Sequence, residues 1–141
     1  MNNEEKIREL LNDEKRSHLI IIDGRSGSGK SRLIKKVLSE LNDSVRIPYS
    51  EFIDLLLCDI KSRTDYFKES LFLYKIIAFD DMDFLRGKLA AQETTAYIIN
   101  NLLKNKIHVI LIGINLIERV PKLLTCMNKE DVTWITLHGY R

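Results

Sequence analysis

The chain has 141 residues, of which 45% are hydrophobic and 30% are charged, and its formal net charge is only +2. This composition excludes a disordered chain, and the length fits one globular domain that we expect to span residues 1–141. So small a net charge gives no sign of nucleic-acid binding by bulk charge, so we expect any contact with DNA to be local.

The sequence shows no targeting signal and no metal-binding cluster. No apolar run approaches the ~20 residues that cross a membrane, and the polar, acidic start Met1–Glu5 is unlike a secretory signal. We therefore expect a cytoplasmic protein with no membrane partner. Cys58 and Cys126 lie far apart, and the three histidines are isolated in the sequence. The apolar neighbours of Cys58 favour a buried helix residue over a nucleophile.

The pattern of apolar residues predicts alternating helices and strands along the chain. Strands that alternate with helices favour a parallel sheet with helices on both of its faces. We expect, in chain order, helix 4–16, strand 18–23, a helix from a glycine-rich loop to about 42, strand 45–49, helix 51–60, short helix 65–72, strand 74–81, helix 88–104, strand 107–113, helix 116–124 with a bend or start near Pro121, and strand 132–137.

Two of these helices carry expectations about single residues. Ser50 is a candidate N-cap for the helix that starts at residue 51. Apolar residues at helical spacing predict the buried stripe of this helix and of the long helix that follows Gly87. The expected stripes are Phe52, Leu55, Leu56 and Ile60 in the first helix, and Leu89, Ala96, Ile99 and Leu103 in the second.

The glycine-rich loop reads Gly-Arg-Ser-Gly-Ser-Gly-Lys-Ser and satisfies the phosphate-binding pattern G-x-x-x-x-G-K-[ST] at every constrained position. Its glycines allow backbone N–H groups to turn toward a phosphate. Lys30 would place its charge beside the β and γ phosphates, and the Ser31 hydroxyl would bind Mg²⁺. The alternative is a turn that only caps a helix. The loop therefore predicts an ATP or ADP site with Mg²⁺, formed by Gly24, Arg25, Ser26, Gly27, Ser28, Gly29, Lys30, Ser31 and Arg32. Within it, Arg25 points to solvent or reaches over a bound phosphate.

Paired acids at the end of an apolar strand complete the expected nucleotide site. Asp80 would hold the Mg²⁺ shell, directly or through water, and Asp81 would polarise the attacking water. The alternative is a solvated acidic turn, which Asp83 continues. Together with the loop, the pair predicts Ser31 and Asp80 as metal-binding residues, and Lys30 and Asp81 as catalytic residues.

The stretch 76–88, Ile-Ile-Ala-Phe-Asp-Asp-Met-Asp-Phe-Leu-Arg-Gly-Lys, followed by Gln-Glu at 92–93, resembles the ATPase core of the bacterial DnaA family of replication initiators. That family has Asp-Asp-x-x-Phe-Leu-x-Gly-Lys followed by Gln-Glu, and segments 45–52 and 67–69 are also similar, so the likeness covers about 18–137. It implies an α/β fold, a P-loop NTPase of the AAA+ type, with a five-stranded parallel sheet in the order 5-1-4-3-2. It also implies a role in starting or loading the replication machinery.

The resemblance weakens after the fourth strand. The family has a polar residue there that senses the γ-phosphate. The tightest match is Ile114, and Asn115, one position later, is the candidate for this catalytic role. The family's arginine finger has no counterpart in segment 123–128, and Arg119 and Lys122 are alternative candidates. No stretch corresponds to the family's helical lid or its helix-turn-helix domain, so we do not expect origin recognition by that domain.

The leading functional hypothesis is a DnaA-like ATP-binding protein that acts in replication initiation or helicase loading and hydrolyses ATP weakly by itself. Its expected partners are a DnaA-type initiator or a replicative helicase. One alternative is a regulatory module that docks on such a partner without turnover, which the unmatched arginine finger favours. Another is a small-molecule kinase, which needs a mobile, arginine-bearing lid that no segment supplies.

The resemblance also implies contact with single-stranded DNA by the region between the second and third strands. Lys61, Arg63 and Lys68 would contact phosphates there, with Tyr66 and Phe67 available for base stacking. The alternative is a solvated basic helix end over a core phenylalanine.

Overall fold

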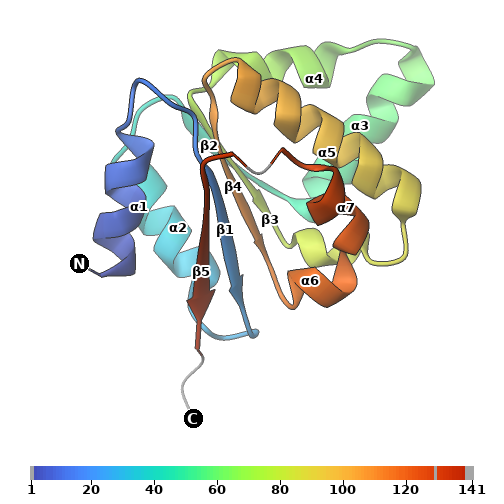
Figure 1. Cartoon of the computed structure of the whole chain (residues 1–141). Coiled ribbons are helices and arrows are strands. Elements are labelled where there is room, and N and C mark those ends of the chain that lie inside the picture. Colours follow the sequence, from blue (N-terminus) through green and yellow to red (C-terminus); the bar gives the residue numbers. More distant parts are fainter. Residues whose placement is uncertain (1, 129, 139–141) are drawn as a thin grey trace.

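The computed structural model describes residues 2–128 and 130–138. At its centre lies a parallel sheet with the strand order β2-β3-β4-β1-β5 (Figure 1). Counted from the other edge this is the order 5-1-4-3-2, so the fold inferred from the resemblance is confirmed. The strands are β1 (Leu19–Gly24), β2 (Ser44–Pro48), β3 (Ile76–Asp80), β4 (His108–Gly113) and β5 (Val132–Leu137).

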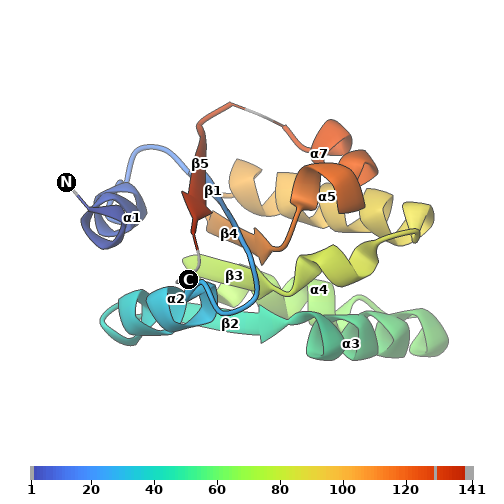
Figure 2. The same cartoon turned by 90° about the horizontal axis from the view of Figure 1, so that it is seen from below.

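Helices cover both faces of the sheet, as Figure 2 shows. Alternate residues of a strand point to opposite faces. Ile20 and Ile22 of β1 therefore share a core with α1 and α2, whereas Leu19 and Ile21 share one with the helices of the other face. The helices are α1 (Asn3–Leu11), α2 (Lys30–Ser39), α3 (Tyr49–Ser62), α4 (Tyr66–Ser70), α5 (Leu89–Lys104), α6 (Leu116–Arg119) and α7 (Pro121–Cys126), with 3₁₀ turns at Leu71–Leu73 and Met82–Leu85.

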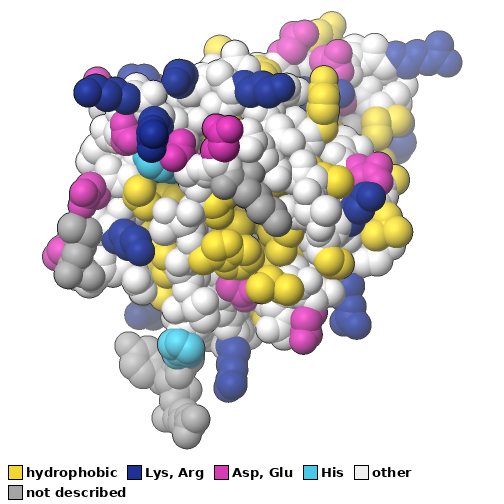
Figure 3. Space-filling view, in the orientation of Figure 1, with side chains coloured by type: hydrophobic (Ala, Val, Ile, Leu, Met, Phe, Trp, Pro, Cys, Tyr) yellow, Lys and Arg dark blue, Asp and Glu magenta, His cyan; other side chains and the backbone are white. Residues whose placement is uncertain are grey.

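Strand β5 forms an edge of the sheet, and its outer side is only partly covered. Trp134 of β5 and Ile117 of α6 are both exposed. Hydrophobic side chains gather on this face of the molecule, and acidic and basic side chains are interspersed around them (Figure 3). Within the described part of the chain, no helix combines the length and apolar character needed to cross a membrane.

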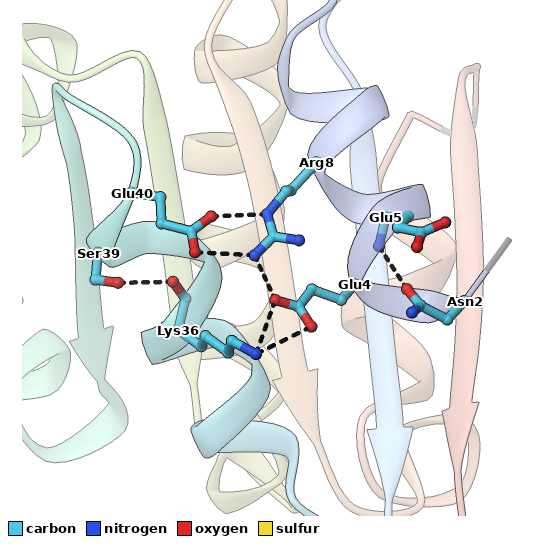
Figure 4. Close-up of polar contacts among 7 residues, drawn as sticks. All are labelled: Asn2, Glu4, Glu5, Arg8, Lys36, Ser39 and Glu40. Carbon is cyan, nitrogen blue, oxygen red and sulfur yellow. Dashed lines mark hydrogen bonds and ion pairs between the residues drawn. The ribbon is translucent and has the colours of Figure 1, made fainter.

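An ion-pair network fastens α1 to α2 (Figure 4). The Nε and Nη2 atoms of Arg8 donate to the Glu40 carboxylate at 2.8 and 3.0 Å, and Arg8 also contacts Glu4. The ammonium of Lys36 lies 3.3 Å from the Glu4 carboxylate. Because Ile7 is fully buried beneath this network, α1 is packed against α2 by apolar contacts as well as by charge.

Helix α1 ends at Leu11, earlier than the predicted end at residue 16. The carboxylate of Asp13 accepts the backbone N–H groups of Lys15 and Arg16, and it lies 2.8 Å from Nε2 of His18. An aspartate that binds nearby N–H groups in this way stabilises a turn in competition with the helix. The same His18 contact holds the pKa of Asp13 down, to about 2.

The structure corrects three predictions for α3, those for Ser50, Cys58 and Ile60. The helix begins at Tyr49, with Pro48 at the N-cap position and no side-chain cap, so Ser50 is not the N-cap. Its buried residues are Phe52, Leu56 and Asp59, a spacing that turns the neighbouring positions outward. Cys58 is therefore exposed rather than buried. Ile60 is 66% exposed for the same reason.

In α5 the buried stripe begins later than expected. Leu89, in the first turn, is 59% exposed, and the first buried residue is Gln92. The Gln92 amide donates to the carbonyl of Leu85 at 3.0 Å and accepts the N–H of Leu123 at 3.1 Å. The glutamine of the family-like segment thus ties α5 to the turn after β3 and to α7.

Candidate functional site

The loop between β1 and α2 lies at the carboxyl edge of the sheet and depends on glycine at three positions. Gly27 and Gly29 have φ angles of +80° and +89°, in the left-handed region that side chains disfavour. At Gly24 a Cβ atom would lie 2.7 Å from the carbonyl oxygen of Leu137 and 2.7 Å from Oγ of Ser28. The loop conformation therefore explains these three glycines of the motif.

The first turn of α2 presents backbone donors to the inside of this loop. The first helical hydrogen bond runs from the N–H of Leu33 to the carbonyl of Gly29 at 2.9 Å. The N–H groups of Lys30, Ser31 and Arg32 therefore have no acceptor within the helix. The first turn also contains no acidic residue. These free donors and the positive end of the helix dipole favour an anion at this position.

Two buried polar groups in the loop, the Lys30 side chain and the Oγ atom of Ser28, fit a bound phosphate. The Lys30 ammonium is buried and donates to the carbonyl of Arg25 at 2.7 Å, so its charge stays within the loop. The Oγ atom of Ser28 is buried and finds no hydrogen-bond partner among the described residues. A buried hydroxyl without a partner is uncommon, and a phosphate oxygen would satisfy it. The side chains of Arg25 and Ser26 are exposed at the rim, so Arg25 has the solvent-facing position.

The end of β3 meets the loop through Asp80, which is fully buried. The Ser31 hydroxyl donates to Oδ2 of Asp80 at 3.0 Å, and the N–H of Asp81 donates to Oδ1 at 2.8 Å. Hydroxyl and carboxylate oxygens are the ligands that Mg²⁺ prefers. The described residues include no group of three or more His, Cys, Asp or Glu side chains placed to hold a metal. A Mg²⁺ ion at this position would therefore take its other ligands from phosphate and water.

Arg46 of β2 also binds Asp80, a contact that was not predicted from the sequence. Its Nε and Nη2 atoms both lie 2.7 Å from Oδ2 of Asp80. Arg46 pairs with Ala78 across the parallel strands, and Pro48 pairs with Asp80, so Arg46 and Asp80 share one face of the sheet. A charged residue inside a short apolar strand was the available signal. The register that aligns it with Asp80 is not visible in the sequence.

Asp81 follows Asp80 with a φ angle of +59°, in the left-handed region. Partial burial, and next the negative charge of Asp80, raise the pKa of the Asp81 carboxyl. A carboxyl group with a raised pKa holds a proton more readily, as a group that accepts a proton from water must do. The surroundings of Asp81 are thus compatible with the role expected from its position in the motif.

Asn115 lies beside the start of the loop. It is exposed at the N-cap position of α6, and Asp23 accepts its backbone N–H at 2.9 Å. Asn115 lines a cavity of about 340 Å³ together with Gly24 and Arg25 of the loop and Trp134 of β5. The structure therefore places Asn115 on the β5 side of the loop.

The two substitute candidates for the arginine finger are both engaged within the chain. Nη1 of Arg119 lies 3.2 Å from Oδ2 of Asp83, a buried residue whose Oδ1 accepts the N–H of Ile114 at 3.2 Å. The ammonium of Lys122 lies 3.4 Å from the carboxylate of Glu93. Arg119 therefore helps to hold the turn after β4, and a role in phosphate contact would require it to leave Asp83.

The basic residues expected to contact DNA lie around the turn between α3 and α4. Lys61 and Arg63 are exposed at the end of α3. Lys68 in α4 is paired with Asp65 at 2.9 Å, and this contact raises the pKa of Lys68. Lys61 and Arg63 are thus better placed than Lys68 to meet an external phosphate.

Of the two aromatic residues in this region, only one is available for stacking. Tyr66 is 75% exposed at the start of α4. Phe67 is buried and packs edge-on against Phe52, with ring centroids 5.8 Å apart. The carboxylate of Asp59 accepts the N–H of Phe67 at 3.1 Å and so fixes the start of the helix. The prediction of Phe67 as a stacking residue was wrong, because α4 turns it into the core.

Comparison with known proteins places this geometry in a family. The model of the family described as the bacterial DnaA ATPase domain matches residues 6–135. No curated protein sequence matches the chain. The family match agrees with the phosphate-binding loop, the acids after β3 and the strand order described above.

Several solved structures have a similar fold. A replication initiator DnaA bound to AMPPCP and single-stranded DNA has a TM-score of 0.76 and 20% identity, over 94% of this chain and 45% of that chain. Domain III of the Thermotoga maritima replication initiation protein DnaA has a TM-score of 0.74 and 18% identity, over 94% and 59%. The DnaC helicase loader has a TM-score of 0.76 and 15% identity, over 97% and 92%.

The chain spans about half the length of these two DnaA chains, and at such identities the structures show a shared fold alone. The family match is independent of them and covers most of the sequence. The chain belongs to the family of bacterial DnaA ATPase domains.

Proposed function

We propose that this chain binds ATP and ADP with Mg²⁺ at its phosphate loop and acts in DNA replication initiation or helicase loading. The observation that supports the nucleotide site most strongly is the 3.0 Å contact between Ser31 and Asp80. These residues are 49 positions apart in the sequence. In P-loop proteins the corresponding hydroxyl and acid hold Mg²⁺ beside the phosphates.

Each part of the proposed site has a distinct task. The free N–H groups of the first turn of α2 and the ammonium of Lys30 would hold the phosphate oxygens. Ser31 and Asp80 would hold Mg²⁺, which offsets phosphate charge when it is bound. Asp81 would orient and polarise the attacking water. Asn115 would sense the terminal phosphate from the β5 side of the loop.

Calorimetric titration with ATP and Mg²⁺ tests the nucleotide site. Lys30→Ala removes charge-assisted hydrogen bonds worth ~1.5 to 3 kcal/mol, so ATP affinity should fall roughly ten- to a hundredfold. Lys35→Ala is the matched control, because Lys35 lies on the same helix and is exposed. Equal ATP affinity for wild type and Lys30→Ala would exclude the proposed site.

The family and the similar structures suggest the partners. One similar structure is an initiator with single-stranded DNA bound, and another is a helicase loader. We infer that this chain meets a DnaA-type initiator or a replicative helicase, and that it contacts single-stranded DNA weakly through Lys61, Arg63 and Lys68. The net charge of only +2 supports a local contact instead of a broad basic surface.

Binding of a fluorescent oligonucleotide at low salt tests the DNA contact. Lys61→Glu/Arg63→Glu should bind clearly more weakly than wild type. Lys35→Glu/Lys104→Glu carries the same change in net charge at exposed positions elsewhere and should bind like wild type. If both double variants bind DNA equally well, the region between β2 and β3 is not the contact site.

A second candidate function is a regulatory module that binds nucleotide without turning it over. The engagement of Arg119 with Asp83 and of Lys122 with Glu93 favours it. An arginine finger is worth ~10³ to 10⁵ in rate, so the isolated chain should bind ATP yet hydrolyse it very slowly.

Phosphate release with and without candidate AAA+ partners separates the two functions. An ATPase that receives its finger from a neighbour should accelerate steeply on mixing, and Asp81→Asn should abolish the gain without loss of ATP binding. A regulatory module should show no gain. Brisk hydrolysis by the monomer alone would contradict both and would indicate an arginine acting within the chain.

A further inference from the structure

We infer that Arg46 offsets the negative charge of Asp80, the proposed metal-binding acid, and that it makes nucleotide binding less dependent on Mg²⁺. The inference rests on the proposed nucleotide site and adds a determinant of metal dependence to it. Two nitrogens of Arg46 lie 2.7 Å from Oδ2 of Asp80, the same oxygen that accepts the Ser31 hydroxyl. The guanidinium and the Ser31 hydroxyl therefore share the carboxylate oxygen that would bind a divalent cation.

The position of Arg46 in the sheet explains how it reaches this oxygen. Arg46 lies in the edge strand β2, on the face that α2 covers, and its partner in β3 is Ala78. The small side chain of Ala78 leaves room for the guanidinium to pass along the sheet toward Asp80, two residues further on. The Arg46 side chain remains 25% exposed, whereas that of Asp80 is 1% exposed. The pair thus joins a fully buried acid to a cation at the rim of the site.

The buried acid needs a cation, and among the described residues Arg46 is the one in contact with it. A buried carboxylate without a counter-charge is strongly unfavourable. Lys30 does not make this contact, because its ammonium is held at the carbonyl of Arg25. Asp80 and Asp81 carry two negative charges at the site, and Lys30 and Arg46 carry two positive charges. The charges of these four side chains therefore cancel before any metal arrives.

This balance has two consequences that act in the same direction. Without Arg46, a triphosphate would approach a site with an excess negative charge, and Mg²⁺ would be needed to offset it. With Arg46, the charge of Asp80 is already offset, so the triphosphate can enter without metal. A divalent cation at Asp80, in turn, meets a fixed positive charge a few ångströms away, which lowers its affinity. Both effects narrow the gap between ATP affinity with Mg²⁺ and ATP affinity without it.

The test is the ratio of ATP affinities measured by calorimetry in excess Mg²⁺ and in EDTA. Arg46→Gln keeps a hydrogen-bond donor near Asp80 but removes the charge, so the ratio should widen by at least about tenfold relative to wild type. Arg46→Lys keeps the charge and should stay close to wild type. Lys35→Gln removes one exposed charge at a residue with no assigned binding role and is the control for general charge effects.

A second readout needs no nucleotide. Electron paramagnetic resonance with Mn²⁺ alone should show tighter metal binding by Arg46→Gln than by wild type, because the competing cation is gone. Circular dichroism establishes that each variant is folded. If Arg46→Gln does not fold, the wild-type protein is tested alone in EDTA. Loss of ATP binding by wild type in EDTA would overturn the inference, and retained ATP binding would support it.

The outcomes distinguish this inference from the proposed function. An unchanged affinity ratio in folded Arg46→Gln, with ATP binding still dependent on Lys30, overturns the role of Arg46 and leaves the nucleotide site standing. Unchanged Mn²⁺ affinity in folded Arg46→Gln also counts against the role of Arg46. Failure of wild type to bind ATP under either condition overturns both.

Discussion

Two buried aspartates lie at the same edge of the sheet, three residues apart, and each is paired with an arginine. Asp80 binds Arg46 at 2.7 Å, and Asp83 binds Arg119 at 3.2 Å. Their surroundings differ. Asp80 accepts a hydrogen bond from Ser31 of the phosphate loop. Asp83, in contrast, binds the turn after β4 and makes no hydrogen bond with the loop among the described residues.

The surroundings of Asp83 indicate a structural role. Its carboxylate accepts the N–H of Ile114, and at Gly113 a Cβ atom would lie 3.0 Å from that carboxylate and 2.5 Å from the Leu116 side chain. Asp83 therefore locks the turn after β3 to the turn after β4. A buried acid paired with arginine therefore does not by itself identify a functional site. The role of each acid depends on the other group that its carboxylate binds, which is Ser31 of the loop for Asp80 and the N–H of Ile114 for Asp83.

The largest expected effect is a loss of stability when Asp83 is replaced, and it distinguishes the structural role of Asp83 from the proposed binding role of Asp80. Asp83→Ala leaves Arg119 without its partner and should lower the free energy of unfolding by about 3 kcal/mol, near the lower end for a broken buried pair because Arg119 is one-third exposed. Urea denaturation measures the loss. The ATP affinity of the folded variant should equal that of wild type. A variant with wild-type stability and lost ATP binding would place Asp83 in the nucleotide site.

The second contrast concerns two glycines, Gly24 at the end of β1 and Gly113 at the end of β4. Gly24→Ala and Gly113→Ala each introduce a Cβ atom closer than 3.0 Å to existing atoms, and each should cost ~1 to 3 kcal/mol of stability. Only Gly24→Ala should also weaken ATP binding, because Gly24 shapes the loop. Denaturation and calorimetry on both variants make the comparison, and equal loss of ATP affinity in the two would remove the distinction between the regions.

The smallest expected effect concerns Asp81 and pH. Its folded-state pKa is raised above the ordinary value of 3.8, so the folded state holds the proton more tightly than the unfolded state does. Its contribution therefore lowers stability as pH rises above about 3.8 and levels off above the raised pKa. Asp81→Asn should be slightly more stable than wild type at neutral pH, and the difference should shrink on acidification. A difference independent of pH would show that Asp81 is not destabilised by its surroundings.

Most of the fold could be predicted from the sequence because its signals are local. The apolar runs of β1 and β4 mark buried strands, and the glycine pattern marks the phosphate loop. Errors arose where a helix face was assigned from neighbours alone. Cys58 has apolar neighbours, yet the helix buries Asp59 beside it, whose carboxylate holds the start of α4.

The candidate site was predictable only in part. The Ser31–Asp80 contact follows from two motifs that belong together in P-loop proteins. Arg46 and Arg119 could not be assigned, because their partners depend on strand register and on the path of the chain after β4. Both are long-range charge pairs, and no local pattern in the sequence encodes them.

A crystal structure of the protein with a non-hydrolysable ATP analogue and Mn²⁺ tests the central claim most directly, because anomalous scattering locates the metal. The account predicts the triphosphate within the loop Gly24–Ser31, beside Lys30, and the metal next to Ser31 and Asp80. A nucleotide bound elsewhere, or a metal remote from Asp80 with the Arg46 contact unchanged, would contradict it.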